Sequence, residues 1–474
     1  MKRIIQLIIC THFLLTTYIV NAQNKLTLQQ CVETGIANNL QVQQSSFQME
    51  REEITWKQSK LNRLPDLNAN VNHGINRGRS IDPFTNSFIN ERVSYAGYGL
   101  NSGVLLFNGL SLHNNIIRNA LAFEASKMEW QQEKDNLTMN IILGYLQVLS
   151  NEELLNQSRN QETLLAKQVE RMEVLNKEGA IAPSVVSDLR GQLAGDQLSI
   201  IDAQNTLESS KILLFQLMNI PYDRNILFEK IDAASFAERY DVTPDDIFTI
   251  ASRQFALIKA AELRKQSAAR AVKSVKGELY PTLTLNGNLN TNYSSVAMQN
   301  IFINNTEVVS NDYVLISGNP SPVIRQQSNF SSNKIPYRNQ LDNNIFTSVS
   351  LNLSIPIFNS FFVRNRVKLA KIELRNNEKI EQTTKTQLRQ NIEQAHINMT
   401  TAFDRYKTLL EQVKAYEESF IAAETRFNEG VGNTIDYLTA KNNLDRALIN
   451  LITAKYDYVL RTKILDYYQG KPLF

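Results

Sequence analysis

The sequence predicts an α+β membrane protein with an internal duplication, in which short strands form a barrel and long helices form a coiled-coil wall. Three observations predict this class. Short motifs occur twice in the same order, and alternating strand-like segments occur in two pairs. In addition, two segments of about 68 residues contain almost none of the Gly and Pro residues that interrupt helices. Strands and very long helices in one chain limit the architectures that can be built.

The duplicated motifs divide the mature chain into two repeats. Pro281 follows Pro65 by 216 residues, whereas Phe358 follows Phe107 by 251 residues. The 35-residue difference is therefore one insertion between the two strand-like segments of the second copy. Such repetition predicts a symmetric architecture with a shared core. The predicted segments are a signal peptide (1–22), a first repeat (23–218), a linker (219–241), a second repeat (242–467) and a C-terminal tail (468–474).

Residues 1–22 have the composition of a secretory signal peptide. Lys2 and Arg3 precede a mostly apolar core, and the small Ala22 stands at the expected cleavage site. Cleavage would take these two residues from the 50 basic residues and leave 48 against 47 acidic residues, which gives no reason to expect nucleic-acid binding. Cys31 would then be the single cysteine, so no intramolecular disulfide can form. We expect it to be a small buried residue on the first helix.

Each repeat is predicted to open with a helix. Thr27 begins a capping box that predicts a helix over 27–61, and Thr243 caps the corresponding helix over 243–277. A proline follows each helix within a few residues and prevents its continuation.

Strands are predicted after these helices. Four segments alternate apolar with small polar residues, namely 67–72, 98–107, 282–290 and 346–357. This alternation is typical of transmembrane barrel strands, although an antiparallel sandwich with one solvated face has the same pattern. The connections 77–96 and 291–345 are polar and are predicted to be loops, the second of them long, exposed and extracellular.

Two long helices are predicted over 110–177 and 361–428, each roughly 100 Å long at 1.5 Å per residue. Their partner segments, 184–218 and 433–467, have about half that length. In each repeat, the opening helix and the partner segment stacked end to end would match one long helix. A single pair of helices of this length cannot bury its own apolar stripe, so a homo-oligomeric coiled-coil wall is expected.

Four strands per chain cannot close a barrel, because even small barrels need about eight. Two chains would give eight strands and a barrel filled by side chains. Three chains would give twelve strands and leave a lumen, which suits the inward Asn, Ser and Thr side chains. No phosphate-binding loop, nucleophile motif or metal-ligand spacing is present, so neither an enzyme nor a cofactor is predicted.

The duplicated plan resembles the TolC-type outer-membrane efflux protein family over 25–467. The resemblance also rests on two strand-ending motifs and two turn motifs, namely Leu106-Phe107-Asn108-Gly109, Ile357-Phe358-Asn359-Ser360, Asn176-Lys177-Glu178-Gly179 and Phe427-Asn428-Glu429-Gly430. It implies a homotrimer that contacts the lipid of the outer membrane through a 12-stranded β-barrel. A 12-helix coiled-coil barrel would continue this barrel into the periplasm. A periplasmic adaptor (membrane fusion) protein and an inner-membrane transporter would complete the system.

The resemblance also implies functional residues. Aligning the second turn on Gly430 places a pore gate at Asp436, Phe427 and Thr439, where Thr439 departs from an acidic position and Phe427 lacks a hydroxyl. The bland interpretation of Asp436 is a carboxylate favoured by a helix N-terminus. The other implied residues are adaptor-docking turn residues (Gly179, Asp188, Gly430) and membrane-interface aromatics (Phe107, Phe358).

The function expected from these observations is a passive exit channel for small molecules. An outer-membrane channel of a type I protein secretion system is the alternative within the same class. A non-transport coiled-coil adhesin or structural protein is the alternative from a different class, but it would not need the helix–strand–strand–helix unit twice.

Overall fold

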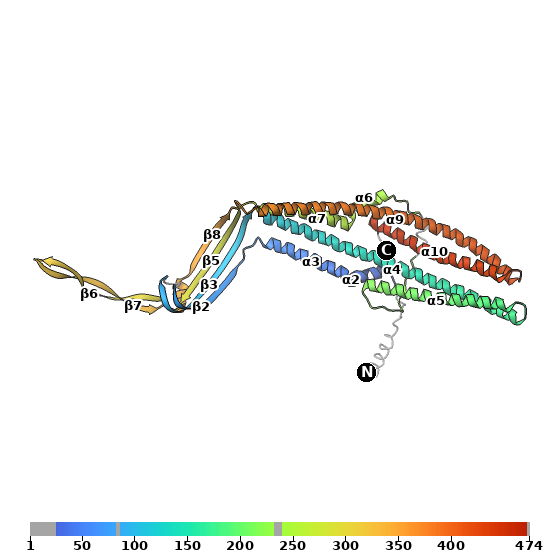
Figure 1. The fold of residues 1–474 in the computed structure, drawn as a ribbon, viewed down its shortest axis with the longest axis horizontal. Coiled ribbons are helices and arrows are strands. Elements are labelled where there is room, and N and C mark those ends of the chain that lie inside the picture. Colours follow the sequence, from blue (N-terminus) through green and yellow to red (C-terminus); the bar gives the residue numbers. More distant parts are fainter. Residues whose placement is uncertain (1–24, 82–85, 232–238, 472–474) are drawn as a thin grey trace, which may run out of the picture. The chain divides into compact units, whose positions relative to one another are not determined.

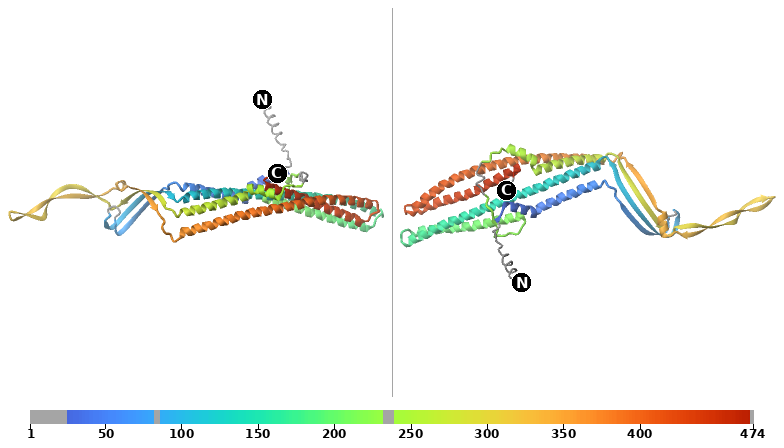
Figure 2. Two further views of the ribbon diagram at one scale, coloured as in Figure 1. Left: turned by 90° about the horizontal axis from the view of Figure 1, so that it is seen from above. Right: turned by 180° about the vertical axis from the view of Figure 1, so that it is seen from behind.

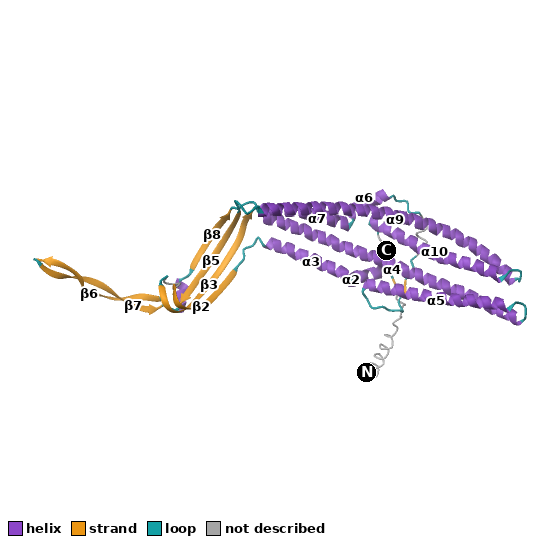
Figure 3. Cartoon of the chain, viewed as in Figure 1, coloured by secondary structure: helices purple, strands orange, loops and turns teal. Residues whose placement is uncertain are grey.

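The computed structural model describes residues 25–81, 86–231 and 239–471. The predicted signal peptide lies outside the described residues. The chain divides into two compact units, which we call the helical unit (Met1–Ile54, Ala120–Ala268 and Leu374–Phe474) and the strand unit (Thr55–Asn119 and Ala269–Glu373). Figure 3 distinguishes their helices and strands by colour.

The two long helices form as predicted. Helix α4 (Ser111–Lys177) and helix α9 (Phe362–Asn428) each contain 67 residues. Their partners α5 (Pro183–Met218) and α10 (Thr434–Gln469) each contain 36 residues. In the helical unit, α4 lies beside α5 and α9 lies beside α10, so that two helical hairpins result (Figure 1).

The prediction of one unbroken opening helix per repeat was wrong. The first is divided into α2 (Leu28–Asn38) and α3 (Leu40–Leu61), and the second into α6 (Pro244–Gln254) and α7 (Ala256–Gly277). Asn39 and Phe255 at the breaks are extended. The Asn39 side chain caps α3 by accepting hydrogen bonds from the Gln41 and Val42 N–H groups. Asn favours such capping positions over the interior of a continuous helix. The predicted caps at Thr27 and Thr243 are confirmed.

A short strap covers one face of the first hairpin. Strand β1 (Lys25–Leu26) pairs in parallel with β4 (Leu227–Phe228), which lies in the predicted linker. Tyr145 of α4 is fully buried under this pair, and its ring packs edge-on against Phe228. Cys31 is buried in the same cluster and free, as predicted, and burial raises the pKa of its thiol to about 12.

The strand unit contains a four-stranded antiparallel sheet in the order β2-β3-β5-β8 (Figure 2). Its strands are β2 (Asn68–Ile81), β3 (Phe88–Asn108), β5 (Thr282–Ser294) and β8 (Phe346–Ser354).

The register places the predicted apolar and polar positions on opposite faces of this sheet. Leu285 lies opposite both Val104 and Leu351, whereas Asn288 lies opposite Asn101 and Ser348. Because side chains alternate along a strand, one face carries aliphatic side chains and the other carries Asn, Ser and Thr. Strands β2 and β8 are the two edges.

Both predicted loops contain regular structure instead. The segment 77–96 is largely strand, because β2 and β3 extend into it. The segment 291–345 contains β6 (Met298–Ile316), β7 (Asn319–Lys334) and the short helix α8 (Tyr337–Asn343). Strands β6 and β7 pair with each other, and Ser317 and Gly318 between them both have positive φ, as a tight hairpin turn requires. Cross-strand apolar pairs within the polar sequence, such as Phe302 with Phe330, favour this ribbon over a loop.

Within the described residues, none of the helices combines the length and the apolar character that a membrane crossing would need.

Candidate gate at the ends of the helical hairpins

The two hairpin turns have the same backbone geometry. Gly179 and Gly430 both have φ of +75°, a conformation that favours glycine. In the first turn, the Ala180 N–H donates to the Leu175 carbonyl at 2.9 Å, and the Gly179 N–H donates to the residue three positions earlier. The second turn repeats both bonds. Each turn is therefore a Schellman motif, which supplies hydrogen-bond donors to the last carbonyl groups of a long helix. The left-handed backbone of the turn explains why glycine occupies both positions.

The helices that leave these turns begin differently. Asn433 caps α10 by accepting the Asp436 N–H at 2.7 Å, whereas α5 begins at Pro183 without a side-chain cap. The carboxylate of Asp436 thus lies in the first turn of α10, where the helix dipole favours negative charge. Asp436 and Thr439 are both exposed and three residues apart, so they share one helix face. Asp188 is exposed on α5.

Phe427 is buried within the protomer. Its ring stacks on Tyr437, with 4.9 Å between centroids and 18° between planes. The pair belongs to a core cluster that joins both hairpins and includes Leu165, Val169, Met172, Val186 and Leu189. Desolvation by burial raises the pKa of Tyr437 to about 12. The ring of Phe427 thus packs inside one chain. A direct role for Phe427 in the pore stays a prediction.

Polar bonds also join the hairpins near their turns. The Gln168 side chain donates to the Asn428 side chain at 3.2 Å, and the Arg171 guanidinium donates to the Asn428 carbonyl at 3.2 Å. These bonds connect α4 with the end of α9.

A buried ion cluster connects α5 with α10, and sequence reasoning missed it. The Lys441 ammonium lies 2.9 Å from the Asp196 carboxylate and 2.6 Å from the Asp445 carboxylate. Lys441 is 3% exposed and Asp196 is 9% exposed. Burial raises the pKa of Asp445, and the hydrogen bond and charge of Lys441 oppose that shift. Separating the two hairpins would leave a buried charge without its partner, which is costly in free energy. The cluster therefore holds the hairpins together.

One part of this cluster had a sequence signal. Lys441 and Asp445 are four residues apart, the spacing of an ion pair on a helix. Asp196 lies in the other repeat, and neither its proximity nor the burial of the cluster can be read from local sequence.

The predicted membrane-interface aromatics lie in the strand unit. Phe107 and Phe358 are both exposed. Phe107 adjoins an irregularity in the pairing of β3 with β5, and Phe358 packs edge-on against Phe361. Their interface role stays a prediction. In the part of the chain that the structure describes, no cluster of His, Cys, Asp and Glu side chains is arranged to hold a metal ion.

Comparisons with known proteins agree with this architecture. Residues 251–466 match the family described as outer membrane efflux protein. The fold is similar to the outer membrane protein VceC from Vibrio cholerae (TM-score 0.72, 14% identity, covering 94% of this chain and 97% of that chain). It is also similar to the CmeC outer membrane channel from Campylobacter jejuni (TM-score 0.71, 16% identity, 94% and 85% covered). The MtrE outer membrane channel from Neisseria gonorrhoeae, solved in its open state, gives a TM-score of 0.71 at 14% identity, with 94% and 89% covered.

The resemblance to the outer-membrane efflux protein family is thereby confirmed. At these identities the solved structures establish the fold. A comparison with curated proteins finds no match.

Proposed function

Because this chain resembles outer membrane efflux proteins in sequence and outer-membrane channels in fold, we propose that it is one subunit of a passive outer-membrane channel for the efflux of small molecules. The subunit resides in the outer membrane and extends into the periplasm. It is a conduit and not an enzyme. Three copies form the channel, and a periplasmic adaptor and an inner-membrane pump complete an export system in which the energy is supplied outside this chain.

The four-stranded sheet carries this proposal. One face exposes Val349, Leu351 and Leu353 on the edge strand β8, while the opposite face carries side-chain hydrogen bonds such as that from Asn101 to Asn70. The two edges, β2 and β8, have no described partner on their outer sides. An apolar outer face, a polar inner face and open edges suit a sheet that closes with other copies in a membrane. Three such sheets give a 12-stranded barrel with an aqueous lumen.

The long helices support lateral assembly. Helix α9 exposes a series of large apolar side chains along its length, namely Leu369, Ile372, Ile380, Ile397 and Ile421. Exposed apolar side chains repeated along one helix are typical of a surface that another helix covers. In the proposed trimer, this surface packs against a neighbouring copy and the helices form a 12-helix tunnel.

The hairpin turns are proposed to close the tunnel at its periplasmic end. Threefold symmetry would place three copies of the exposed Asp436 around the axis, and the turns at Gly179 and Gly430, together with Asp188, would face the adaptor. The family description names efflux, which supports the proposed export of small molecules as the first choice and leaves protein secretion as the alternative. A sheet with one polar and one aliphatic face suits a membrane channel, and an adhesin would not require one.

Paired substitutions on the two sheet faces test the proposal. Leu351→Arg puts a cation on the aliphatic face, which costs about 2–4 kcal/mol at the centre of a bilayer. We expect it to abolish trimers in the outer membrane. The matched control Asn352→Arg changes the next residue, on the polar face, and should keep trimers that show altered ion selectivity in planar bilayers.

Native mass spectrometry of detergent-extracted protein should give the mass of three chains, with discrete conductance steps in planar bilayers. A monomer that stays soluble without detergent, or equal tolerance of both arginines, would refute the channel.

A further inference from the structure

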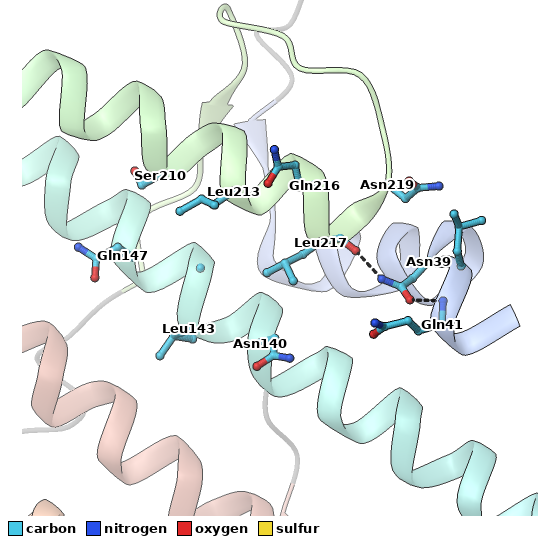
Figure 4. A pocket seen from close by; sticks show the side chains of 12 residues that line it. Asn39, Gln41, Asn140, Leu143, Gln147, Ser210, Leu213, Gln216, Leu217 and Asn219 are labelled. Atoms are coloured by element: carbon cyan, nitrogen blue, oxygen red, sulfur yellow. Dashed lines mark hydrogen bonds between the residues drawn. The ribbon is translucent and has the colours of Figure 1, made fainter. Parts of the chain in front are cut away.

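A groove of about 690 Å³ opens at what we call the first joint, where the end of α5 meets the break between α2 and α3 (Figure 4). Helix α4 forms its other wall. Of the twelve lining residues, four are leucines, one is glycine and seven carry amide or hydroxyl groups. None is charged. The volume lies in the range of small-molecule sites, roughly 300–1,000 Å³.

Hydrogen bonds between backbone and asparagine side chains hold the first joint. The Asn39 amide donates to the Leu217 carbonyl at 3.1 Å, and its oxygen accepts from the Gln41 N–H at 2.9 Å (Figure 4). From the other side, the Asn219 amide donates to the Asn38 carbonyl at 3.2 Å. Both walls are thus fixed before any ligand arrives, which lowers the ordering cost of binding.

The second repeat has aromatic residues at the equivalent joint. Phe255 occupies the helix break that corresponds to Asn39, and Tyr467 and Tyr468 stand where the first repeat has Gln216 and Leu217. The three rings pack together, with centroids 5.2–5.8 Å apart. Joining helices end to end therefore does not by itself produce this groove lining, because aromatic rings pack on one another at the same joint in the other repeat.

The groove opens on the α4 face away from the strap. Leu143 and Gln147 are exposed in the groove, and Tyr145 lies two residues from each, roughly 200° around the helix. The Tyr145 hydroxyl is within hydrogen-bonding distance of the Leu26 and Glu229 carbonyl oxygens of the strap region. A strap on the inner side of a conduit would obstruct it. If the chain is a channel wall, the groove therefore faces the passage.

We propose that the first-joint groove is a binding site in the passage for an uncharged amphipathic small molecule in transit. This assignment rests on the proposed channel function and specifies the substrate class. Leu143 and Leu213 are 50% and 60% exposed in the groove, so covering them with an apolar body is favourable. The amide side chains supply both donors and acceptors for neutral polar groups. A charged group would lose its hydration there without gaining a counter-ion.

Chloramphenicol, which is uncharged and has an aromatic body with hydroxyl and amide groups, is a suitable probe. Equilibrium dialysis of the purified full-length protein in detergent measures its binding without requiring conduction. Leu213→Gln removes an apolar wall, and Leu143→Trp occupies the groove. We expect each to weaken binding on the order of tenfold, equivalent to about 1.4 kcal/mol.

The matched controls change leucines of similar exposure on the same two helices. Leu198→Gln on α5 and Leu164→Trp on α4 lie outside the groove and should bind chloramphenicol as the unchanged protein does. In single-channel recordings, chloramphenicol should produce transient blockades whose dwell times shorten in the two groove variants alone.

The outcomes separate this site from the channel itself. Conductance steps without saturable chloramphenicol binding, or equal loss in groove and control variants, would overturn the groove while leaving the channel intact. Binding with the expected variant pattern but no conductance would keep the site and refute the channel. If the groove variants weaken the trimer and leave binding unchanged, the groove is a contact between copies and the proposal is wrong.

Discussion

Replacing Lys441 with methionine should weaken the packing of the two helical hairpins against each other near their turns. The substitution keeps an unbranched apolar stem but removes the cation that lies 2.9 Å from Asp196 and 2.6 Å from Asp445. Two largely buried carboxylates would then face each other without a counter-charge. Removing one partner of a buried ion pair typically costs 3–5 kcal/mol, so Lys441→Met should lower the free energy of unfolding by about 3–5 kcal/mol at neutral pH.

The loss should depend on pH in a defined direction. Burial already raises the folded-state pKa of Asp445, and losing the attraction of Lys441 raises that pKa further. A carboxyl whose folded pKa exceeds its unfolded value contributes stability below the unfolded pKa of about 3.9 and loses it as pH rises through the folded pKa. The deficit of Lys441→Met should therefore be larger at pH 8 than at pH 5, with a slope of up to about 1.4 kcal/mol per pH unit for this group.

Denaturant unfolding of the detergent-solubilised protein, followed by circular dichroism at both pH values, measures the effect. Hydrogen exchange should show faster opening of α5 and α10. Two variants serve as controls. Lys127→Met breaks the exposed pair with Glu124 and should cost less than about 1 kcal/mol. The triple variant Asp196→Asn, Lys441→Met, Asp445→Asn removes all three charges and should recover much of the loss. The reasoning is refuted if Lys441→Met costs no more than Lys127→Met, or if its deficit grows as the pH falls.

Two further predictions concern the turns. Asp436→Asn should lower cation selectivity and block by multivalent cations in single-channel recordings while trimers still form, because the three carboxylates of the proposed trimer would attract cations near its axis. Unchanged selectivity would leave Asp436 as a helix-start residue alone. Gly430→Ala puts a side chain on a residue with left-handed backbone, where the surrounding space is open, so the cost is that of the backbone conformation alone. Hydrogen exchange in the second turn should become faster by an amount equivalent to about 1–2 kcal/mol. Exchange at the wild-type rate would show that the turn can adopt another conformation.

The long helices could be predicted from sequence because their signal is local. Few residues that interrupt helices occur in either segment, and the observed limits of α4 and α9 agree with the predicted ones to within one residue. The breaks at Asn39 and Phe255 were not predicted, because each depends on a partner far along the chain. Asn39 bonds to Leu217, and Phe255 packs on the end of α10. Local propensity cannot report either contact.

The ribbon of β6 and β7 was missed for a related reason. Its sequence is rich in Asn and Ser, which favour turns. Pairs such as Phe302 with Phe330 stabilise it only when the register is known. At the candidate gate, the turn glycines were predicted from sequence. The burial of Phe427 and of Lys441 was not, because it depends on how two hairpins from different repeats pack.

In the proposed trimer, differences between the two repeats would mark where the channel departs from sixfold symmetry. Lengths and turn geometry are the same in both, as a continuous wall requires. Aligning the two repeats places Arg190 at the position of Lys441, yet Arg190 is exposed and pairs with Glu173, while Lys441 is buried against α5. The same alignment places Asp188 at the position of Thr439. In the proposed trimer, the depth of Asp436 along the tunnel would therefore differ from that of Asp188 by three residues of helix, roughly 4.5 Å. Alternating hairpins would then carry acidic side chains at different depths, and the buried cluster around Lys441 would resist movement of one hairpin relative to the other in the same chain.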